Sequence, residues 1–487
     1  MMIESFLLFC SVLFLFSLYA SKAGTRFGVP VLLIFLGVGM LFGTSGFGFH
    51  FENYDMSQAI GTVALCIILF SGGLDTKYSD IRPVAAQGVI LATIGVILTA
   101  FFSGIFIYFI VNIWFSSIYI TFFEAMLLAS VMSSTDSASV FSILRGKGVK
   151  LKNNLKPMLE LESGSNDPMA YMLTVVLIQL ITSGQHDTAI TYGPAILSFF
   201  MQFFIGAGSG FILGKITVWI LNKINLGNNS FYPIFLIASG IFIFSATVFI
   251  KGNGFLAVYL AGLVIGNSKF AYKRLSLTFF DGLAWISQIV MFLSLGLLVN
   301  PSELWPVAMV SLLIGLFMIV GSRPLSVFIS LLPFRKTHLR DKIFVSWVGL
   351  KGAVPILFAI FPLTAEIAVS QFIFNVVFFI TLMSLLIQGT SLTQVAKWLH
   401  LSNTENDIVF KDLDVELEDE IKYIMTEVEV SDNWFKKGNL LKNMPLPEHT
   451  QVMMILRDGK CIIPKKNTPL TKKDKLVVIT TDEDGLT

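Results

Sequence analysis

The sequence has few charged side chains for its length. Asp, Glu, Lys and Arg make up only 14% of its 487 residues, whereas 54% are hydrophobic and the mean hydropathy is +0.76. A soluble domain needs far more polar surface than this, so the soluble globular class is excluded. Nucleic acid is excluded as a partner as well, because the excess basic residues lie in loops between apolar segments and form no single basic patch.

Cysteine and histidine are also scarce. The three cysteines, Cys10, Cys66 and Cys461, show no paired spacing, and the five histidines are scattered over loops and the ends of apolar segments. These patterns predict neither a disulfide framework nor a zinc site, and no cofactor is expected. A membrane-embedded hydrolase is disfavoured too, since no histidine lies inside an apolar segment where it could activate Ser165.

Long apolar runs are what the sequence has in abundance. A helix needs about 20 apolar residues to cross a bilayer. The runs predict an all-α polytopic membrane protein with about 13 transmembrane helices, at residues 3–20, 29–43, 58–73, 86–113, 119–143, 158–182, 193–220, 231–250, 254–267, 282–300, 305–330, 343–361 and 370–392. The first run starts with Glu4 and not with a basic region, so we expect a retained helix and no signal peptide. In the seventh run, Gly206, Gly210 and Gly214 predict a close helix-packing face.

Basic residues alternate between the predicted loops. One set of loops holds nearly all of them, including Lys22, Lys77 and Lys223, whereas the other set has little that is basic beyond Lys251. Cytoplasmic loops of membrane proteins are enriched in Lys and Arg. We therefore expect a multi-pass protein of the bacterial inner membrane, surrounded by lipid, with its N-terminus outside and its C-terminus in the cytoplasm.

The C-terminal segment has a different composition from the rest. Residues 401–487 hold 17 of the 32 acidic side chains but only 12 of the 34 basic ones. The stretches YIMTEVEV and KLVVITT are predicted strands, VMMILRDGKCIIP is a predicted hairpin turning at Asp458-Gly459, and LLKNMPL is a predicted short helix. We therefore expect a transmembrane domain at 1–400 and a small cytoplasmic α+β domain at 401–487. The latter is too short for a dinucleotide fold and has no glycine-rich phosphate loop.

Polar residues inside the apolar runs point to a site, because charge at membrane depth costs free energy. Five consecutive polar residues, Ser133–Ser137, interrupt the fifth run, and such a segment makes a poor helix that offers cation ligands in Thr135 and Asp136. The sixth run carries Glu162 and Asp167, which project about 140° apart around a helix and should serve different partners. Asp167 lies deeper. A buried carboxylate that holds either a proton or a cation, but not both, is sufficient for exchange.

Two further charges lie inside apolar runs. Arg323 needs a buried counter-ion, for which Glu162 is the best candidate, and Lys351 lies where Gly349 and Gly352 break the twelfth run. A positive charge there would offset the carbonyl ends of half-helices. Interruptions in two runs of opposite direction predict two broken crossing helices in an inverted repeat, with a mid-membrane site. Each feature has a structural alternative. Ser133–Ser137 would be a polar stripe against a neighbouring helix, the carboxylates of the sixth run would form an ion pair, and Lys351 would be a solvated lysine at a kink.

These motifs together resemble the cation:proton antiporter-1 family, of the NhaP and sodium–proton exchanger type. The resemblance covers nearly the whole membrane part and rests on Thr135-Asp136, Glu162-Ser163, Asn166-Asp167, Arg323 and the segment GLKGAVP. It implies a homodimer in which a mobile core domain carries the ion site across the membrane, past a scaffold domain, by an elevator motion. Many relatives have Arg where this chain has Lys351, which keeps the charge but not the fork geometry.

The resemblance also implies roles for single residues. Asp167 would be the carboxylate that binds the monovalent cation and the proton, and Asn166 would hold the broken helices together. The other implied members of the site are Asp136, Thr135 and Ser163, and Glu162 would form a structural ion pair with Arg323. An Asn-Asp pair in place of Asp-Asp resembles the electroneutral branch of the family, in which one proton exchanges for one cation.

The C-terminal segment resembles the C-terminal half of a potassium-conductance regulator, the RCK-C or TrkA-C type. Bacterial potassium/proton antiporters often carry that module, which implies a small regulatory ligand and favours K⁺ over Na⁺. The expected function is therefore antiport of a monovalent cation for protons, in cation and pH homeostasis. A proton-independent cation channel is the nearest alternative, although the sequence has no TVGYG-like run to build a filter. A membrane-embedded hydrolase acting through Ser165 and a pure sensor are the others.

Overall fold

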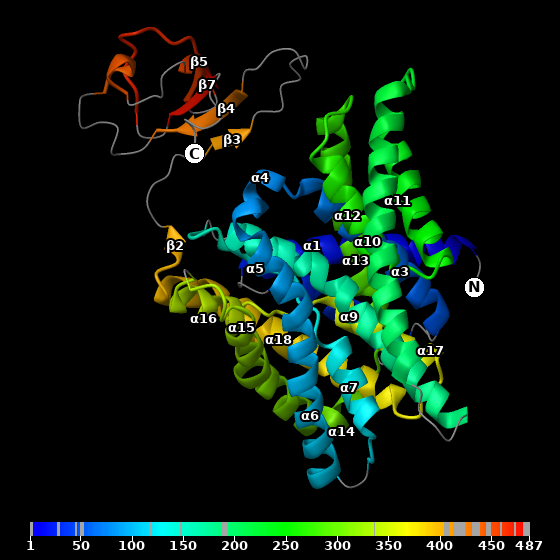
Figure 1. Ribbon diagram of the computed structural model, residues 1–487. Helices are drawn as coiled ribbons and strands as arrows, with labels where there is room; N and C mark the ends of the chain where they lie inside the picture. The colour runs from blue at the N-terminus through cyan, green and yellow to red at the C-terminus, as the bar shows by residue number, and fades with distance from the viewer. Residues whose placement is uncertain are drawn as a thin grey trace. The chain divides into compact units, whose positions relative to one another are not determined.

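The computed structural model describes most of the chain and divides it into two compact units (Figure 1). The units are Met1–Ser402 and Asn403–Thr487. The described residues are 3–26, 30–43, 46–48, 53–115, 118–146, 149–186, 192–335, 337–403, 410–412, 424–430, 439–444, 450–457, 460–471 and 474–480.

The first unit is built from helices. Their bounds are α1 (Ile3–Arg26), α2 (Val31–Phe42), α3 (Tyr54–Asp75), α4 (Tyr78–Ile81), α5 (Ala85–Ile90), α6 (Val96–Trp114), α7 (Phe122–Val131), α8 (Ser137–Gly146), α9 (Leu155–His186), α10 (Tyr192–Lys223), α11 (Phe231–Phe249), α12 (Gly254–Gly266), α13 (Lys273–Leu297), α14 (Pro301–Phe317), α15 (Arg323–Ser330), α16 (Leu339–Trp347), α17 (Ala353–Thr364) and α18 (Ser370–Trp398). Each of the thirteen predicted spans falls on one of these helices or on a consecutive set of them.

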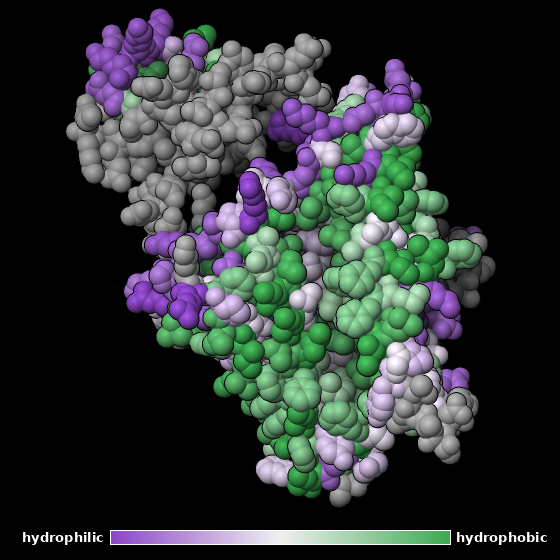
Figure 2. Space-filling view, viewed as in Figure 1, coloured by the Kyte–Doolittle hydropathy of each residue, from purple (hydrophilic) through white to green (hydrophobic). Residues whose placement is uncertain are grey.

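The surface of this unit suits a lipid environment. In the described part of the chain, 7 helices are long and apolar enough to cross a membrane, and shorter apolar helices such as Val31–Phe42 and Ala353–Thr364 accompany them. Figure 2 shows hydrophobic residues over the middle of one face and hydrophilic residues toward its ends. Large apolar side chains such as Phe204 and Phe249 are exposed. The polytopic helical class is thereby confirmed, while the number of thirteen crossings stays a prediction.

The helices fall into two groups by their packing. The first helix group, α1–α3 and α10–α13, is held together mainly by α12 and α13, which pack against α3, and by α10 against α12. The second helix group, α4–α9 and α14–α18, has its most extensive packing between α6 and α7, α14 and α18, and α17 and α18. Fewer contacts join the groups, chiefly α9 with α10 and α17 with α3.

A glycine face joins α10 closely to α12, as its four-residue spacing predicts. A Cβ atom at Gly206 would lie 2.8 Å from the backbone oxygen of Asn253, and one at Gly214 would lie 3.0 Å from the Cα of Ala261. These distances leave no room for a side chain, so the two helix backbones touch.

Two π-helical turns interrupt otherwise α-helical spans in the second helix group. One, η2 (Leu91–Gly95), lies between α5 and α6, and the other, η3 (Met318–Ser322), lies between α14 and α15. The hydroxyl of Ser103 donates to that of Ser322 at 2.8 Å, which joins α6 to η3. Short strands β1 (Lys150–Leu151) and β2 (Ser402–Asn403) form a separate two-stranded sheet.

The second unit is a small antiparallel sheet. Its strands are β3 (Phe410–Asp412), β4 (Ile424–Glu429), β5 (Thr450–Arg457), β6 (Lys460–Ile462) and β7 (Lys475–Thr480), in the order β3-β4-β7-β5-β6. The pairing of Arg457 with Lys460 confirms the predicted hairpin, although its turn residues, Asp458 and Gly459, lie outside the described residues. Of the predicted short helix, the described part is a 3-10 turn, η5 (Leu441–Asn443).

A partly buried ion pair joins the end of β5 to the start of β7. The guanidinium of Arg457 donates to both carboxylate oxygens of Asp474, each at 2.7 Å, and Thr471 donates to the same carboxylate through its backbone and its hydroxyl. Burial raises the pKa of Asp474, but the hydrogen bonds from Arg457 and Thr471 outweigh it and hold that pKa below its usual value. The apolar core beneath includes Ile455 and Leu476.

Candidate functional site

The fifth span is broken between α7 and α8, as its run of polar residues predicts. Residues 132–136 are not helical, because serine and aspartate side chains offer the backbone alternative hydrogen bonds. The hydroxyl of Ser133 donates to the carbonyl of Ser130 at 2.6 Å. Asp136 caps α8, since its carboxylate accepts from the backbone N–H of Ser139 at 3.0 Å and from the Ser139 hydroxyl.

The twelfth span is broken between α16 and α17, and the two breaks cross. The backbone N–H of Asp136 donates to the carbonyl of Leu350 at 2.8 Å, so the two unwound segments touch through their main chains. Close packing around the second break explains its glycines. A Cβ at Gly352 would collide with the carboxylate of Asp136, and one at Gly349 would lie 3.1 Å from the Nε of Arg323.

Asp167 is buried beside the first break and contacts it through Ser134. Its side chain accepts from the hydroxyl of Ser134, and the carbonyl of Ser134 accepts from the ammonium group of Lys351 at 2.9 Å. Asp167 is 7% exposed and Lys351 is 5% exposed. Ser134 therefore connects the carboxylate of α9 with the lysine of the second break. Sequence reasoning singled out the polar run that contains Ser134 but not this residue.

Two side chains of α9 hold the first break in place. The hydroxyl of Ser163 accepts from the backbone N–H of Ser137 at 3.0 Å and donates to the carbonyl of Thr135 at 2.8 Å. The amide of Asn166 donates to the hydroxyl of Thr135 at 2.5 Å. Its oxygen Oδ1 is buried and has no hydrogen-bond partner among the described residues.

Glu162 and Arg323 form an ion pair away from Asp167. The Nη2 atom of Arg323 lies 2.5 Å from Oε1 of Glu162, and both side chains are almost completely buried. The pair joins α9 to α15 inside the second helix group. The angular separation of Glu162 from Asp167 around α9 explains why the two carboxylates have different partners.

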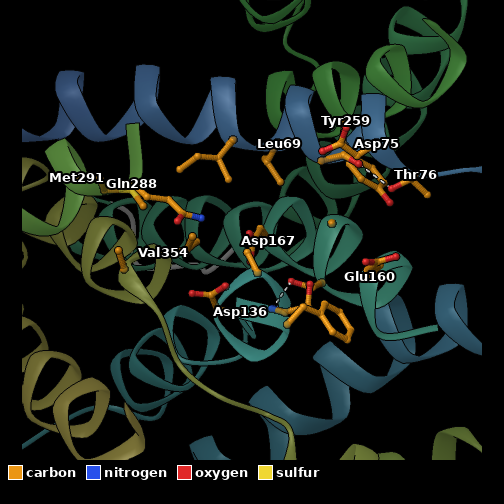
Figure 3. Close-up of a pocket in the computed structure, with 18 of the residues that line it drawn as sticks. Leu69, Asp75, Thr76, Asp136, Glu160, Asp167, Tyr259, Gln288, Met291 and Val354 are labelled. Carbon is orange, nitrogen blue, oxygen red and sulfur yellow. Dashed lines mark hydrogen bonds between the residues drawn. The ribbon is translucent and has the colours of Figure 1, made fainter. Parts of the chain in front are cut away.

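A cavity of about 200 Å³ lies between the two helix groups and reaches Asp167 (Figure 3). The second helix group contributes Asp136, Ser163 and Asp167 to its wall, and the first contributes Tyr259 and Gln288. Thr135, Asn166, Glu162, Arg323 and Lys351 lie behind this wall and do not line the cavity. The predicted site residues are thus brought together in two layers, of which one faces the cavity and the other supports it.

The cavity extends from Asp167 toward helix ends that carry acidic residues. Asp75, the last residue of α3, and Glu160, near the start of α9, line it. In Figure 3, Asp136 and Asp167 lie together near the centre, with Gln288 on one side and Asp75 and Glu160 on the other. The sequence carries no signal for Gln288.

The chemistry of the wall fits a hard monovalent cation. Its polar groups near Asp167 are carboxylate and hydroxyl oxygens, the ligands that such cations prefer. Within the described residues, no group of three or more His, Cys, Asp or Glu side chains is arranged to hold a metal ion.

Two curated relatives are similar to this chain over nearly its whole length. The K(+)/H(+) antiporter NhaP of Alkalimonas amylolytica is 37% identical over 476 residues, which are 97% of this chain and 80% of the relative. The K(+)/H(+) antiporter NhaP2 of Shewanella sp. (strain MR-4) is 36% identical over 482 residues, covering 98% and 81%.

The fold is also found among solved structures. The sodium proton antiporter MjNhaP1 of Methanocaldococcus jannaschii, at pH 8, superposes with a TM-score of 0.68 at 19% identity, over 80% of this chain and 97% of that one. Residues 11–398 match the family described as sodium/hydrogen exchanger, transmembrane. The chain therefore belongs to the sodium/hydrogen exchanger family and is a multi-pass cation:proton antiporter, a transporter and not an enzyme.

Proposed function

We propose that this antiporter exchanges K⁺ for H⁺ across the bacterial inner membrane and that Asp167 is the group both ions share. The observation that carries the proposal is the position of Asp167, a buried carboxylate on the cavity wall beside two crossed helix breaks. K⁺ is preferred over Na⁺ because the two relatives described above are both named as K(+)/H(+) antiporters. The physiological role would be cation and pH homeostasis.

Exchange follows from competition at Asp167. A carboxylate buried within a membrane helix bundle needs either a proton or a cation to offset its charge, so the empty ionised form is costly to carry across the membrane. Ser134 donates to it now, and rotation of that hydroxyl would turn the oxygen lone pairs toward a bound cation. Asp136 and Ser163, on the same wall, are the other proposed ligands.

We propose that the second helix group moves against the first in an elevator motion. The cavity lies between the groups, and the breaks, Asp167 and the Glu162–Arg323 pair all belong to the second one. A rigid displacement of that group would carry the whole site and leave α3, α12 and α13 as the fixed wall. The cavity end at Asp75 and Glu160 would be cytoplasmic, with the N-terminus outside and the C-terminus inside, because the neighbouring loops are basic.

One proton for one cation is the proposed stoichiometry. Asn166 stands beside Asp167 where a second carboxylate would add a second titrating group, and its amide is engaged with Thr135. Lys351 donates to a carbonyl and not to Asp167. An exchange of equal charges would move no net charge, and transport would not respond to membrane voltage.

The direct test uses purified protein in liposomes with a trapped pH indicator. Addition of K⁺, Na⁺ or Li⁺ should release protons from the lumen in the wild type, with K⁺ the most effective, at a rate that an imposed voltage does not change. Cation flux that continues without any proton movement would instead indicate a channel. A voltage-dependent rate would overturn the one-to-one stoichiometry.

The second unit is proposed to regulate this exchange, with a small ligand, in a homodimer. Truncation before Asn403 removes that unit alone, because the chain divides there. The truncated protein should insert, dimerise and transport, with altered activation. Failure to insert or dimerise would make the unit structural and would end the regulatory proposal.

A further inference from the structure

A pair of neutral polar side chains on α18 binds the second break. Ser384 and Gln388 lie one helical turn apart and are 1% and 2% exposed. The hydroxyl of Ser384 accepts from the backbone N–H of Lys351 at 2.9 Å and donates to Oε1 of Gln388 at 2.6 Å. Nε2 of Gln388 donates to the carbonyl of Trp347 at 2.8 Å. One continuous chain of hydrogen bonds thus runs from Lys351 to the end of α16.

The break needs such partners. The last carbonyls of a helix and the N–H groups that precede the next one have no partner within the helices. Inside a membrane no bulk water replaces those partners, and each unpaired group costs free energy. Ser384 and Gln388 supply an acceptor on the α17 side and a donor on the α16 side. They therefore fix both edges of the gap and, with them, the backbone that carries Lys351.

The arrangement repeats what α9 does at the first break. There Ser163 accepts from Ser137 N–H and donates to the Thr135 carbonyl, while Asn166 binds the Thr135 side chain. In both halves the partners are a serine and an amide side chain on the helix that next follows the broken one. The two pairs differ in spacing, three positions apart on α9 and four on α18. The α18 pair has no carboxylate beside it, whereas Asp167 directly follows Asn166.

We propose that Ser384 and Gln388 are positioning residues that set the cation affinity of the site through Lys351 and Ser134. Lys351 reaches the Ser134 carbonyl only if its backbone is held, and the Ser134 hydroxyl binds Asp167. A shift of the Lys351 backbone therefore changes the hydrogen bond that a cation must displace. The charged groups around Lys351 are Arg323, Glu162 and Asp167, and none of them contacts Ser384 or Gln388 in a hydrogen bond that the described residues make. The inference rests on the proposed exchange at Asp167.

The test begins with four single variants in liposomes. Gln388→Met keeps the length of the side chain and removes its hydrogen bonds to Ser384 and Trp347. Ser384→Ala removes the hydroxyl group, whereas Ser384→Thr keeps a hydroxyl group. Thr390→Ala is the matched control, because Thr390 is exposed on the same helix and, among the described residues, its hydroxyl donates to two carbonyls of α18. Apparent cation constant, maximal rate and pH profile are measured for each, together with the melting temperature in detergent.

A positioning role predicts a specific pattern. Gln388→Met and Ser384→Ala each remove two hydrogen bonds. Each should change the apparent K⁺ constant by at least about fivefold, the factor that a single neutral hydrogen bond supplies, and should shift the pH profile. The double variant should add little, since both act through one network, and Ser384→Thr and Thr390→Ala should match the wild type. Introducing Gln388→Met into Lys351→Met, which has no donor for the Ser134 carbonyl, should cause no further change in the K⁺ constant.

Two results would overturn the proposal. A folded Gln388→Met protein with wild-type K⁺ constant and pH profile would make the pair merely structural, whatever its melting temperature. If Gln388→Met does not fold, Ser384→Ala takes its place. A folded Ser384→Ala protein whose K⁺ constant and pH profile match those of Ser384→Thr would overturn the proposal in the same way. Failure of the proposed function itself is distinguishable, because it would appear as absence of proton–cation exchange in the wild type.

Discussion

The two helix breaks solve the same structural problem but carry different chemistry. Each is a gap of five residues in a membrane helix, and each is bound by a serine and an amide side chain from the next long helix. The first break carries Asp136 and lies against the carboxylate of Asp167 on α9, whereas the second carries Lys351 and is bound from α18 by the neutral side chains of Ser384 and Gln388. The architecture of a break is therefore separable from the buried carboxylate, which α9 adds to one of them.

The largest expected effect comes from removing the carboxylate of Asp167, so that α9 offers the first break only neutral side chains, as α18 does at the second. Asp167→Asn keeps the shape of the side chain but cannot exchange a proton for a cation, so antiport should fall to background at every pH. The protein should still fold and dimerise. Proton release on adding K⁺ to liposomes measures the first expectation and size-exclusion chromatography the second. An active variant would move the shared site elsewhere, with Asp136 the first residue to examine.

In the wild type, the same competition can be seen without a mutation. The apparent K⁺ constant should rise as the proton concentration rises, because each ion excludes the other from Asp167. Asp167→Glu should retain weak exchange with a changed K⁺ constant. A constant that does not depend on pH would show that the two ions do not share one carboxylate.

The next effect concerns the ion pair that stands behind both breaks. Arg323→Ala leaves the charge of Glu162 buried and unpaired and should lower the free energy of unfolding by about 3–5 kcal/mol. The double variant Glu162→Gln/Arg323→Gln should recover part of that loss. Thermal unfolding in detergent is measured for the wild type, Arg323→Ala, the double variant and the two single variants Glu162→Gln and Arg323→Gln. Strictly additive losses in the double variant would contradict a direct interaction.

Removing the charge of the second break should have a smaller effect. Lys351→Gln retains a donor for the Ser134 carbonyl but no ammonium group, so exchange should persist with a changed apparent K⁺ constant. Lys351→Arg serves as the control that keeps the charge. Complete loss of exchange in Lys351→Gln, with the protein still folded, would show that the second break is as essential to the ion chemistry as the first.

The smallest effect should come from the cap of α8. Asp136→Asn keeps an oxygen that can accept from Ser139, whereas Asp136→Ala removes it and should cost about 1 kcal/mol more in unfolding free energy. Both variants should also weaken cation binding, because both remove a carboxylate from the cavity wall. Equal stability of the two would show that the cap contributes little, and unchanged K⁺ constants would exclude Asp136 as a ligand.

Much of this protein follows from local sequence. The polar run Ser133–Ser137 and the glycines around Lys351 predict the two breaks, because hydroxyl side chains and missing Cβ atoms act on the backbone within a few residues. The hairpin of β5 and β6 and the glycine face of α10 are local in the same sense. The membrane class follows from composition alone, since lipid tolerates only long apolar helices or closed barrels.

Other features depend on residues that lie far apart in the sequence. Ser134, Lys351 and Asp167 meet only after three spans pack, and no local pattern shows that the lysine binds a serine carbonyl and not a carboxylate. The separation of the site into a layer that lines the cavity and a layer behind it is of the same kind. So is the pairing of Ser384 and Gln388 with a break more than thirty positions earlier in the chain.

The sequence by itself determined that this is a polytopic helical membrane protein with two interrupted helices and buried charges among them. Spacing and hydropathy suffice for that, because both act over one helix at a time. Only the tertiary structure decided which oxygen faces the cavity, which charge supports it from behind, and which neutral side chains complete the second break. Those choices depend on the packing of helices that the chain brings together from distant positions, where a shift of one turn would exchange every partner.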